Sequence, residues 1–129
     1  MKIHEYFADW EISCKCGCRL IAPVESVYRL YALRLLWGKP IIINSAIRCP
    51  EHNKRVGGRA GSTHLPPDFR NHVSKGWGGC AFDIQAAFLD RRHIESIAIQ
   101  CGFTGIGEGE NFIHIDDAAR PNITRWLYT

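Results

Sequence analysis

Residues 112–116, Phe-Ile-His-Ile-Asp, are the stretch from which the expected fold and site both follow. Apolar and polar side chains alternate along it with a period of two, which is the pattern of a β-strand with one face in the core. Its two isoleucines would face the core, and His114 would lie on the opposite, polar face. Residues 79–85 alternate in the same way and place Asp83 on their polar face. If the two strands are neighbours in one antiparallel sheet, Asp83 and His114 project from the same open surface.

The remaining segments predict a small α+β domain. Residues 24–37 have the apolar pattern of a well-buried helix, and the β-branched run at 40–45 predicts a short buried strand. Asp90 can cap a second helix over 91–101. A composition that is 46% hydrophobic is enough for one core. We therefore expect a single domain over residues 1–129, with a small antiparallel sheet and helices packed on one side.

Charge and hydropathy exclude several classes of function. The net charge is +3 and no lysine or arginine run appears, so the sequence does not argue for nucleic acid as a partner. The longest apolar stretches are only a few residues, which excludes membrane insertion. The start, Met1–Glu5, has no apolar signal-peptide core, so we expect synthesis in the cytoplasm without an N-terminal signal. We expect a monomer.

A metal site is the sharpest hypothesis that the residues support. His64 follows a glycine-rich loop and can swing over the surface that carries Asp83 and His114. Two imidazoles and one carboxylate, with a fourth position for water, form a ligand set of the catalytic zinc type. Each residue also has an ordinary explanation, because strand histidines are usually structural and exposed aspartates are usually only solvated.

Three carboxylates are candidates for the base that takes a proton from the attacking water: Glu108, Glu110 and Asp116. If the strand at 112–116 extends back that far, all three share the parity of His114. A carboxylate beside the reacting water is what peptide hydrolysis requires. The residues alone do not choose among them.

The cysteines allow three interpretations. Cys14, Cys16 and Cys18 alternate near the start, and Cys49 follows much later. A disulfide framework would need an oxidising compartment, and a structural zinc held by these four would depart from the usual Cys-x2-Cys spacing. Plain reduced thiols are the default expectation.

The motifs together resemble the M15 metallopeptidases, the zinc D-alanyl-D-alanine carboxypeptidases and peptidoglycan endopeptidases that share a core with the hedgehog signalling domain. The residues that carry this resemblance are Asn44–Asn53, Val56–Gly58, Ser62–His64, Gly79–Ile84 and 112–116. The opening, from Phe7 to Cys18, is similar to the compact phage and prophage members.

The resemblance implies a role for each matching residue. His64, Asp83 and His114 match the ligands of Zn2+. Arg48 matches the arginine that holds a substrate carboxylate, a task that suits a guanidinium fork. Ser62 matches the serine before the first ligand, which contacts substrate or supports the ligand.

The sequence departs from the family pattern in three places. One is Ala46-Ile47, which replaces the usual Gly-Tyr before Arg48, and the other two lie nearer the expected ligands. The segment Leu65–Phe82 between the first two ligands is longer than usual, and we place the insertion at Pro66–Trp77. It contains His72, a rival for the first ligand position. Asn111 occupies the place of the usual acid, whereas Glu108 matches the glutamate of the hedgehog-type domains and Asp116 matches the aspartate of phage-type relatives.

The implied function is zinc-dependent hydrolysis of peptide bonds in bacterial peptidoglycan stem peptides, by a carboxypeptidase or an endopeptidase. The expected setting is the bacterial cell wall, reached as a phage or prophage lysis enzyme or as part of a virion. One alternative is a catalytically silent zinc-containing binding module whose cleft is covered by Pro66–Trp77. Another is a structural protein held together by its cysteines.

Overall fold

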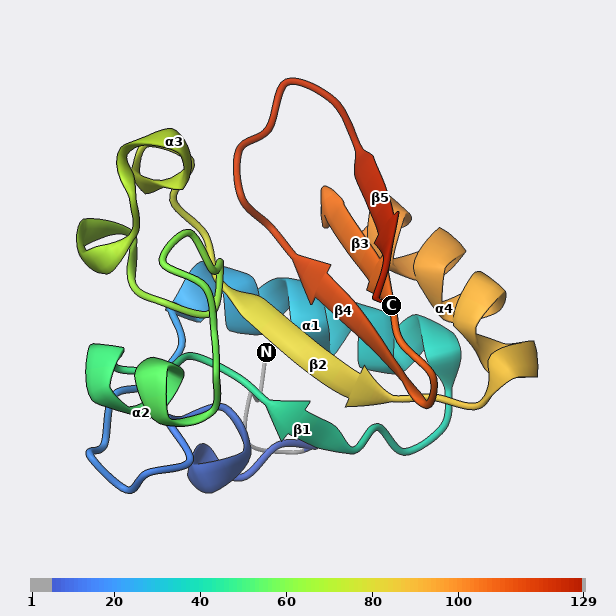
Figure 1. The fold of residues 1–129 in the computed structure, drawn as a ribbon. Coiled ribbons are helices and arrows are strands. Elements are labelled where there is room, and N and C mark those ends of the chain that lie inside the picture. Colours follow the sequence, from blue (N-terminus) through green and yellow to red (C-terminus); the bar gives the residue numbers. More distant parts are fainter. Residues whose placement is uncertain (1–5, 129) are drawn as a thin grey trace.

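The computed structural model describes residues 6–128, apart from the side chain of His72 (Figure 1). It is an α+β fold built on a five-stranded sheet with the strand order β1-β2-β4-β3-β5. The strands are β1 (Ile43–Ser45), β2 (Ala81–Gln85), β3 (Gly105–Glu108), β4 (Phe112–Asp116) and β5 (Thr124–Leu127). The two alternating stretches of the sequence are β2 and β4, and they pair antiparallel as predicted.

The sheet is mixed, so the prediction of a wholly antiparallel sheet is wrong at one edge. β5 pairs parallel with β3, with Thr124 opposite Gly105. The cause is where β5 begins. Gly105 also lies opposite Asp116, the last residue of β4, so β5 starts at the end of the sheet where β4 stops. β5 therefore runs antiparallel to β4. β3 lies between the two and is also antiparallel to β4, so β3 and β5 are parallel.

Two helices cover one face of the sheet, as predicted (Figure 1). The first, α1 (Val24–Trp37), has the predicted bounds and ends at Gly38, whose φ of +76° is a left-handed cap conformation. The second, α4 (Phe88–Gln100), begins earlier than predicted, with Ala87 and not Asp90 at the N-cap. Its first two residues are 70% and 87% exposed, so this turn has no apolar pattern to reveal it.

The core lies between these helices and the sheet. Phe82 of β2, Ile113 of β4 and Leu30 of α1 are at most 1% exposed. Phe82 also packs edge-on against Phe103 at 6.4 Å between ring centroids. The helical face of the sheet is therefore closed, and any chemistry belongs to the other face.

Short elements connect these parts. They are η2 (Asp9–Glu11), α2 (Pro50–Arg55), η3 (Pro67–Phe69) and α3 (His72–Lys75). The helical turn expected at Pro50 is α2, and the expected loop after Pro66 contains η3 and α3. None of the helices in the described part of the chain is long and apolar enough to cross a membrane.

Candidate metal centre

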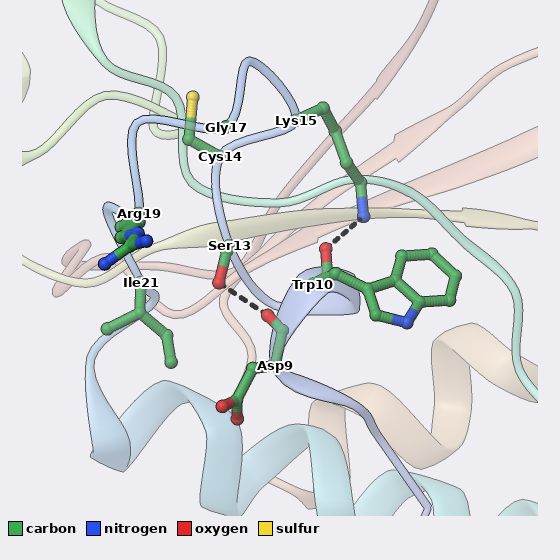
Figure 2. A pocket seen from close by; sticks show the side chains of 8 residues that line it. All are labelled: Asp9, Trp10, Ser13, Cys14, Lys15, Gly17, Arg19 and Ile21. Carbon is green, nitrogen blue, oxygen red and sulfur yellow. Dashed lines mark hydrogen bonds between the residues drawn. The ribbon is translucent and has the colours of Figure 1, made fainter.

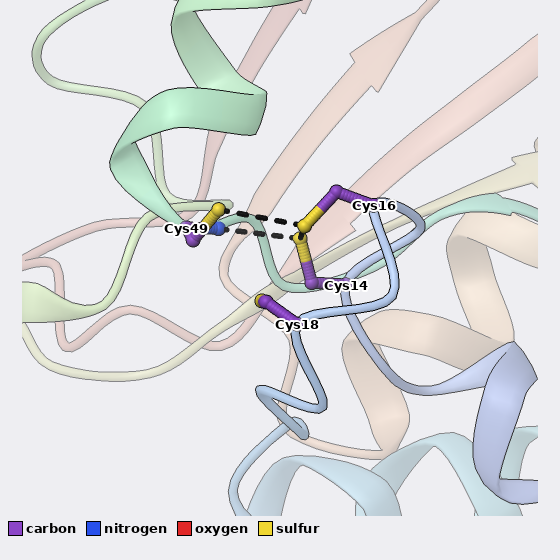
Figure 3. Close-up of side chains that lie close together, drawn as sticks. All are labelled: Cys14, Cys16, Cys18 and Cys49. Atoms are coloured by element: carbon purple, nitrogen blue, oxygen red, sulfur yellow. Dashed lines mark hydrogen bonds between the residues drawn. The ribbon is translucent and has the colours of Figure 1, made fainter.

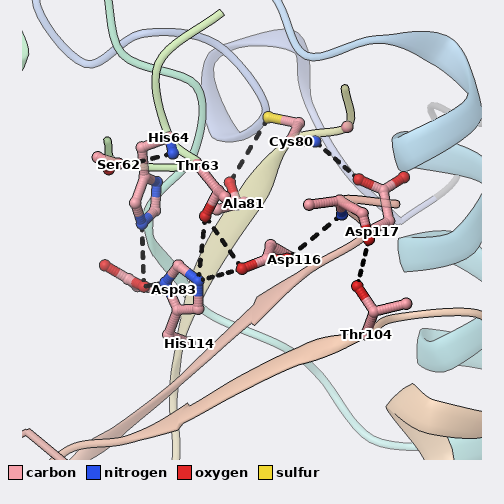
Figure 4. Close-up of polar contacts among 12 residues, drawn as sticks. Ser62, Thr63, His64, Cys80, Ala81, Asp83, Thr104, His114, Asp116 and Asp117 are labelled. Atoms are coloured by element: carbon pink, nitrogen blue, oxygen red, sulfur yellow. Dashed lines mark hydrogen bonds and ion pairs between the residues drawn. The ribbon is translucent and has the colours of Figure 1, made fainter. Parts of the chain in front are cut away.

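The register of β2 and β4 brings two of the three predicted ligands together. Asp83 lies directly opposite His114, so both side chains leave the sheet on the face away from the helices. His64 reaches the same point from the loop that precedes the inserted arm (Figure 4). One ligand atom from each of the three lies within 4.8 Å of the others. Asp83 Oδ1 is 3.1 Å from His64 Nε2 and 3.1 Å from His114 Nδ1.

Each imidazole is held by its other nitrogen. His64 Nδ1 lies 2.6 Å from the carbonyl oxygen of Ala46, which can only accept, so Nδ1 carries the proton. His114 Nε2 lies 2.8 Å from Asp116 Oδ2. A carbonyl or carboxylate behind a metal-ligating histidine orients the ring and raises its basicity. The nitrogens left over, His64 Nε2 and His114 Nδ1, are the two that converge on Asp83.

The protonation states of His64 and Asp83 suit a cation. Burial lowers the pKa of His64, which favours the neutral ring that a metal requires. Burial alone would raise the pKa of Asp83, but the hydrogen bonds from His114 and His64 outweigh it and hold that pKa below its ordinary value. Burial alone would lower the pKa of His114, and the bonds to Asp116 and Asp83 raise it instead, so a metal bound at His114 Nδ1 would displace a proton. These residues fit a zinc ion.

The site is buried, which corrects the expectation of an open surface. The two histidine side chains are each 4% exposed and Asp83 is 15% exposed. Arg48, at 14% exposure, lies beside Asp83, with its Nη2 3.7 Å from Asp83 Oδ2. Solvent therefore reaches the ligands from the side of Asp83 and Arg48.

Arg48 and Ser62 both border the ligands. The Nε of Arg48 donates to Ser45 Oγ at 3.0 Å and its Nη1 donates to Asn53 Oδ1 at 3.2 Å, which fixes the plane of the guanidinium. The Ser62 hydroxyl accepts from the backbone N–H of His64 at 3.2 Å. Ser62 therefore supports the loop that presents the first ligand.

Of the three candidate bases, Asp116 has the predicted parity, whereas Glu108 does not and Glu110 lies outside the strand. Glu108 does not share the parity of His114, because the chain turns between β3 and β4 and Glu108 lies opposite Ile113. It faces the helices, where Arg91 of α4 donates to it at 2.8 Å. Asp116 is fully buried behind His114 and is paired with Arg120. Glu110 is exposed in the turn before β4.

Sequence reasoning missed the aromatic residues that cover the site. Trp126 and Tyr128, at the C-terminal edge strand, lie with their ring centroids 5.1 and 6.3 Å from that of His114. They fit there because Gly107, opposite His114, has no side chain. The signal in the sequence was the spacing of two between these aromatics, which is the period of a strand.

The inserted arm packs beside the site. Arg70, 5% exposed, donates to the carbonyls of Leu65 at 2.9 Å and Gly79 at 2.7 Å, and so ties the two ends of the arm together. Asn71 N–H donates to Ala60 O at 3.0 Å, and the backbone of Trp77 accepts from Ala119. Figure 1 shows η3 and α3 beside the start of β2 and not across the sheet. The side chain of His72, the rival ligand, lies outside the described part of the chain.

A pocket of about 500 Å³ lies elsewhere, on the N-terminal loop (Figure 2). Its lining includes Trp10, Lys15 and Arg19. None of the three predicted zinc ligands lines it. The pocket therefore does not bear on the chemistry of the histidines.

Comparison with known proteins gives one match. The family model described as Peptidase M15 matches residues 5–116, from the N-terminal loop to the end of β4. No curated protein and no solved structure matches the chain. β5, which contains Trp126, and Tyr128 after it lie beyond the matched residues.

Proposed function

This chain belongs to the M15 peptidase family, and from this premise we propose that it hydrolyses peptide bonds in the stem peptides of bacterial peptidoglycan with the help of zinc. The observation that supports the proposal best is the convergence of His64 Nε2, Asp83 Oδ1 and His114 Nδ1. The other ring nitrogen of each histidine is already hydrogen-bonded, to Ala46 O or to Asp116, so the ligand nitrogens are directed at one point. This preorganisation is what a catalytic metal site needs.

Zinc held by these residues would supply a Lewis acid, which polarises a scissile carbonyl and makes water more acidic. The protein supplies the orientation. Asp116 holds the ring of His114, and Ala46 O holds that of His64. The burial of both histidines excludes water from the ligand side, which strengthens the electrostatic interactions there.

Arg48 is the proposed anchor for a substrate carboxylate. Its guanidinium is fixed by Ser45 and Asn53 and lies beside Asp83. A planar guanidinium can bind a carboxylate through two parallel N–H groups. A peptide with a terminal carboxylate near its scissile bond would therefore be oriented at Arg48. Ser62 would support the first ligand.

Glu110 is the base that we propose among the three candidates. Glu108 is committed to Arg91 on the helical face, and Asp116 supports His114. Glu110 lies in the turn that leads into β4, close in sequence to the family position now held by Asn111. An exposed carboxylate in this turn can take a proton from water and return it to the leaving amine.

The silent binding module is the weaker alternative. It requires the Pro66–Trp77 insertion to close the cleft. The contacts of that arm run instead to residues 60–65, 78–79 and 119–120. The setting that we propose, a phage or prophage lysis or virion enzyme acting at the cell wall, rests on the resemblance of the N-terminal opening.

Digestion of purified peptidoglycan by the zinc-loaded protein tests the proposal. We expect new amines, and mass spectrometry of the fragments would distinguish release of a terminal residue from cleavage within the cross-links. Glu110→Gln should lower the rate by a factor of about 100 or more, because it removes the base.

Glu108→Gln is the matched control and should retain the rate, because Glu108 faces the helices. Equal rates for Glu110→Gln and the unaltered protein would reject Glu110 as base. The absence of cleavage in walls of several chemical types, by protein shown to hold zinc, would reject the substrate class.

A further inference from the structure

We propose that Cys14, Cys16, Cys18 and Cys49 bind a second zinc ion, which ties the N-terminal loop to the segment that carries Arg48. The metal site itself is independent of the peptidase reaction, and only its effect on Arg48 rests on the proposed function. It rests on the positions of four sulfur atoms, three from one loop and one from the start of α2 (Figure 3). This site would be structural, because four thiolates fill the coordination sphere of zinc.

The sulfur atoms have the spacing of a tetrahedral thiolate site. All four lie within 4.8 Å of one another. Cys14 Sγ is 3.4 Å from Cys16 Sγ, and Cys16 Sγ is 3.7 Å from Cys49 Sγ. Four sulfurs at the usual zinc–sulfur distance of about 2.3 Å lie roughly 3.8 Å apart. The observed separations therefore leave room for one ion at the centre.

The backbone of the loop is folded so that alternate cysteines converge. In an extended chain the first and last of three alternating residues would be about 13 Å apart, too far for one ion. Here Gly17 and Arg19 have φ values of +86° and +71°, which turn the chain twice. Cys14 N–H donates to Leu20 O at 2.8 Å and closes the loop. Arg19 is a non-glycine residue in a left-handed conformation, which persists only where its surroundings require it.

Backbone N–H groups point at two of the sulfurs. The N–H of Cys49 donates to Cys14 Sγ at 3.4 Å, and the N–H of His52 donates to Cys49 Sγ at 3.4 Å. Such donors stabilise the thiolate form, which is the form that binds a metal. The loop and α2 are thus already joined by the bonds that a thiolate centre uses.

Disulfides explain the cluster less well. All four cysteines are unlinked, and the shortest of the sulfur separations above is 3.4 Å, against about 2.05 Å for a bond. A disulfide needs only two sulfurs, so it gives no reason for four to gather. A metal ion does.

The second site lies next to the first along the chain. Cys49 directly follows Arg48, whose N–H donates to the carbonyl oxygen of His64 at 2.7 Å. Ala46 O, three residues before Cys49, holds the ring of His64. Residues 46–49 therefore contact both centres, and zinc at the cysteines would fix the segment that presents Arg48 to the substrate.

Metal content and cobalt spectra test the site. We expect about two zinc ions per chain in the unaltered protein and about one in the Cys16→Ser/Cys18→Ser double variant. Both cysteines are exposed, so this variant does not disturb the core. With cobalt in place of zinc, thiolate ligands give an intense near-ultraviolet charge-transfer band, which histidine and aspartate ligands do not. The double variant should lose this band.

Two control variants separate this site from the first. Cys101→Ser removes a thiol outside the cluster and should keep the band and both zinc ions. His114→Ala should lose one zinc ion and the peptidase activity but keep the band. One zinc ion per chain in the unaltered and the double variant alike, no charge-transfer band, or a non-reduced mass lower by the hydrogens of a disulfide would each overturn the proposal.

Discussion

At the scale of single residues, the candidate centre depends on which nitrogen each histidine presents. His114 turns Nδ1 to Asp83 because Asp116 accepts at Nε2, 2.8 Å away. Thr63 also donates to Asp116 Oδ2, at 3.0 Å, and Arg120 pairs with the same carboxylate. Asp116 is therefore held rigidly itself. Its effect on the metal passes through the ring of His114.

The substitution Asp116→Asn tests this role. The amide is a weaker and neutral acceptor, so the ring of His114 loses basicity and orientation. We expect the dissociation constant for zinc at this site to rise about 10-fold to 100-fold, measured by competition with a chelator.

Asp117→Asn is the matched control. Asp117 is also buried and charged, but it pairs with Arg29 at 2.7 Å and does not support a ligand. It should lower the free energy of unfolding and leave the affinity for zinc unchanged. Equal zinc affinities for the two variants would contradict the role of Asp116.

At the scale of elements, β3 contains two glycines, and their missing side chains leave space at the site. Gly105 and Gly107 alternate along it on the face of the site. A Cβ on Gly105 would collide with the Asp116 carboxylate and with Arg120, and one on Gly107 would lie 2.5 Å from Trp126 Nε1. The strand leaves room for the support of His114 and for the aromatic cover.

The substitution Gly107→Ala should displace the aromatics from His114. The added methyl would also lie 2.6 Å from the ring of Tyr128, and this overpacking should cost about 1–3 kcal/mol of unfolding free energy. Urea unfolding measures it. Gly76→Ala is the control, because nothing lies within 4 Å of its Cβ. Equal stability of the two variants would show that β5 does not pack on Gly107.

The inserted arm is held chiefly by one residue. Arg70 donates to five backbone carbonyls, those of Thr63, Leu65, Ser74, Gly78 and Gly79. Arg70→Met keeps most of the stem but leaves these acceptors without their donor. We expect a loss of about 3 kcal/mol in the free energy of unfolding and faster proteolysis within the arm.

Arg92→Met, on the exposed face of α4, should change neither quantity. If Arg70→Met were as stable and as resistant to protease as Arg92→Met, the arm would be held by other contacts.

At the scale of the whole molecule, the two faces of the sheet are stabilised differently. α1 and α4 close one face with an apolar core, in which Leu30 and Ile115 are fully buried. The other face is held by polar contacts around His64, Asp83 and His114. Ions bound there stabilise the native state, because the unfolded chain offers no assembled site.

Removal of the metal should therefore lower the melting temperature. An ion present at about a thousand times its dissociation constant contributes roughly 4 kcal/mol, or about 15 °C for a chain of this size. Circular dichroism on heating, with and without chelator, measures the shift, and added zinc should restore it. His114→Ala should show a smaller shift, because it has less metal to lose. An unchanged melting temperature after complete removal of metal would contradict this picture.

Local patterns predicted a large part of the fold. The bounds of α1 follow from the apolar pattern and the glycine after it, and the shared face of Asp83 and His114 follows from the period of two. Both depend only on neighbours in the chain. α4 was misplaced at its start because the exposed Phe88 and Leu89 carry no such pattern.

Residue type and strand parity are local properties, so the sequence alone could indicate His64, Asp83 and His114 as metal ligands. The resemblance to the M15 peptidases added Arg48 as the anchor for a substrate carboxylate. The surroundings of each of these side chains depend on how distant segments pack together. The turn between β3 and β4 sends Glu108 to the helices, and the return of the chain beside β3 brings the rings of Trp126 and Tyr128 against His114. Contacts between distant segments, such as Cys49 with Cys16, depend on which elements pack together, and no local period encodes that choice.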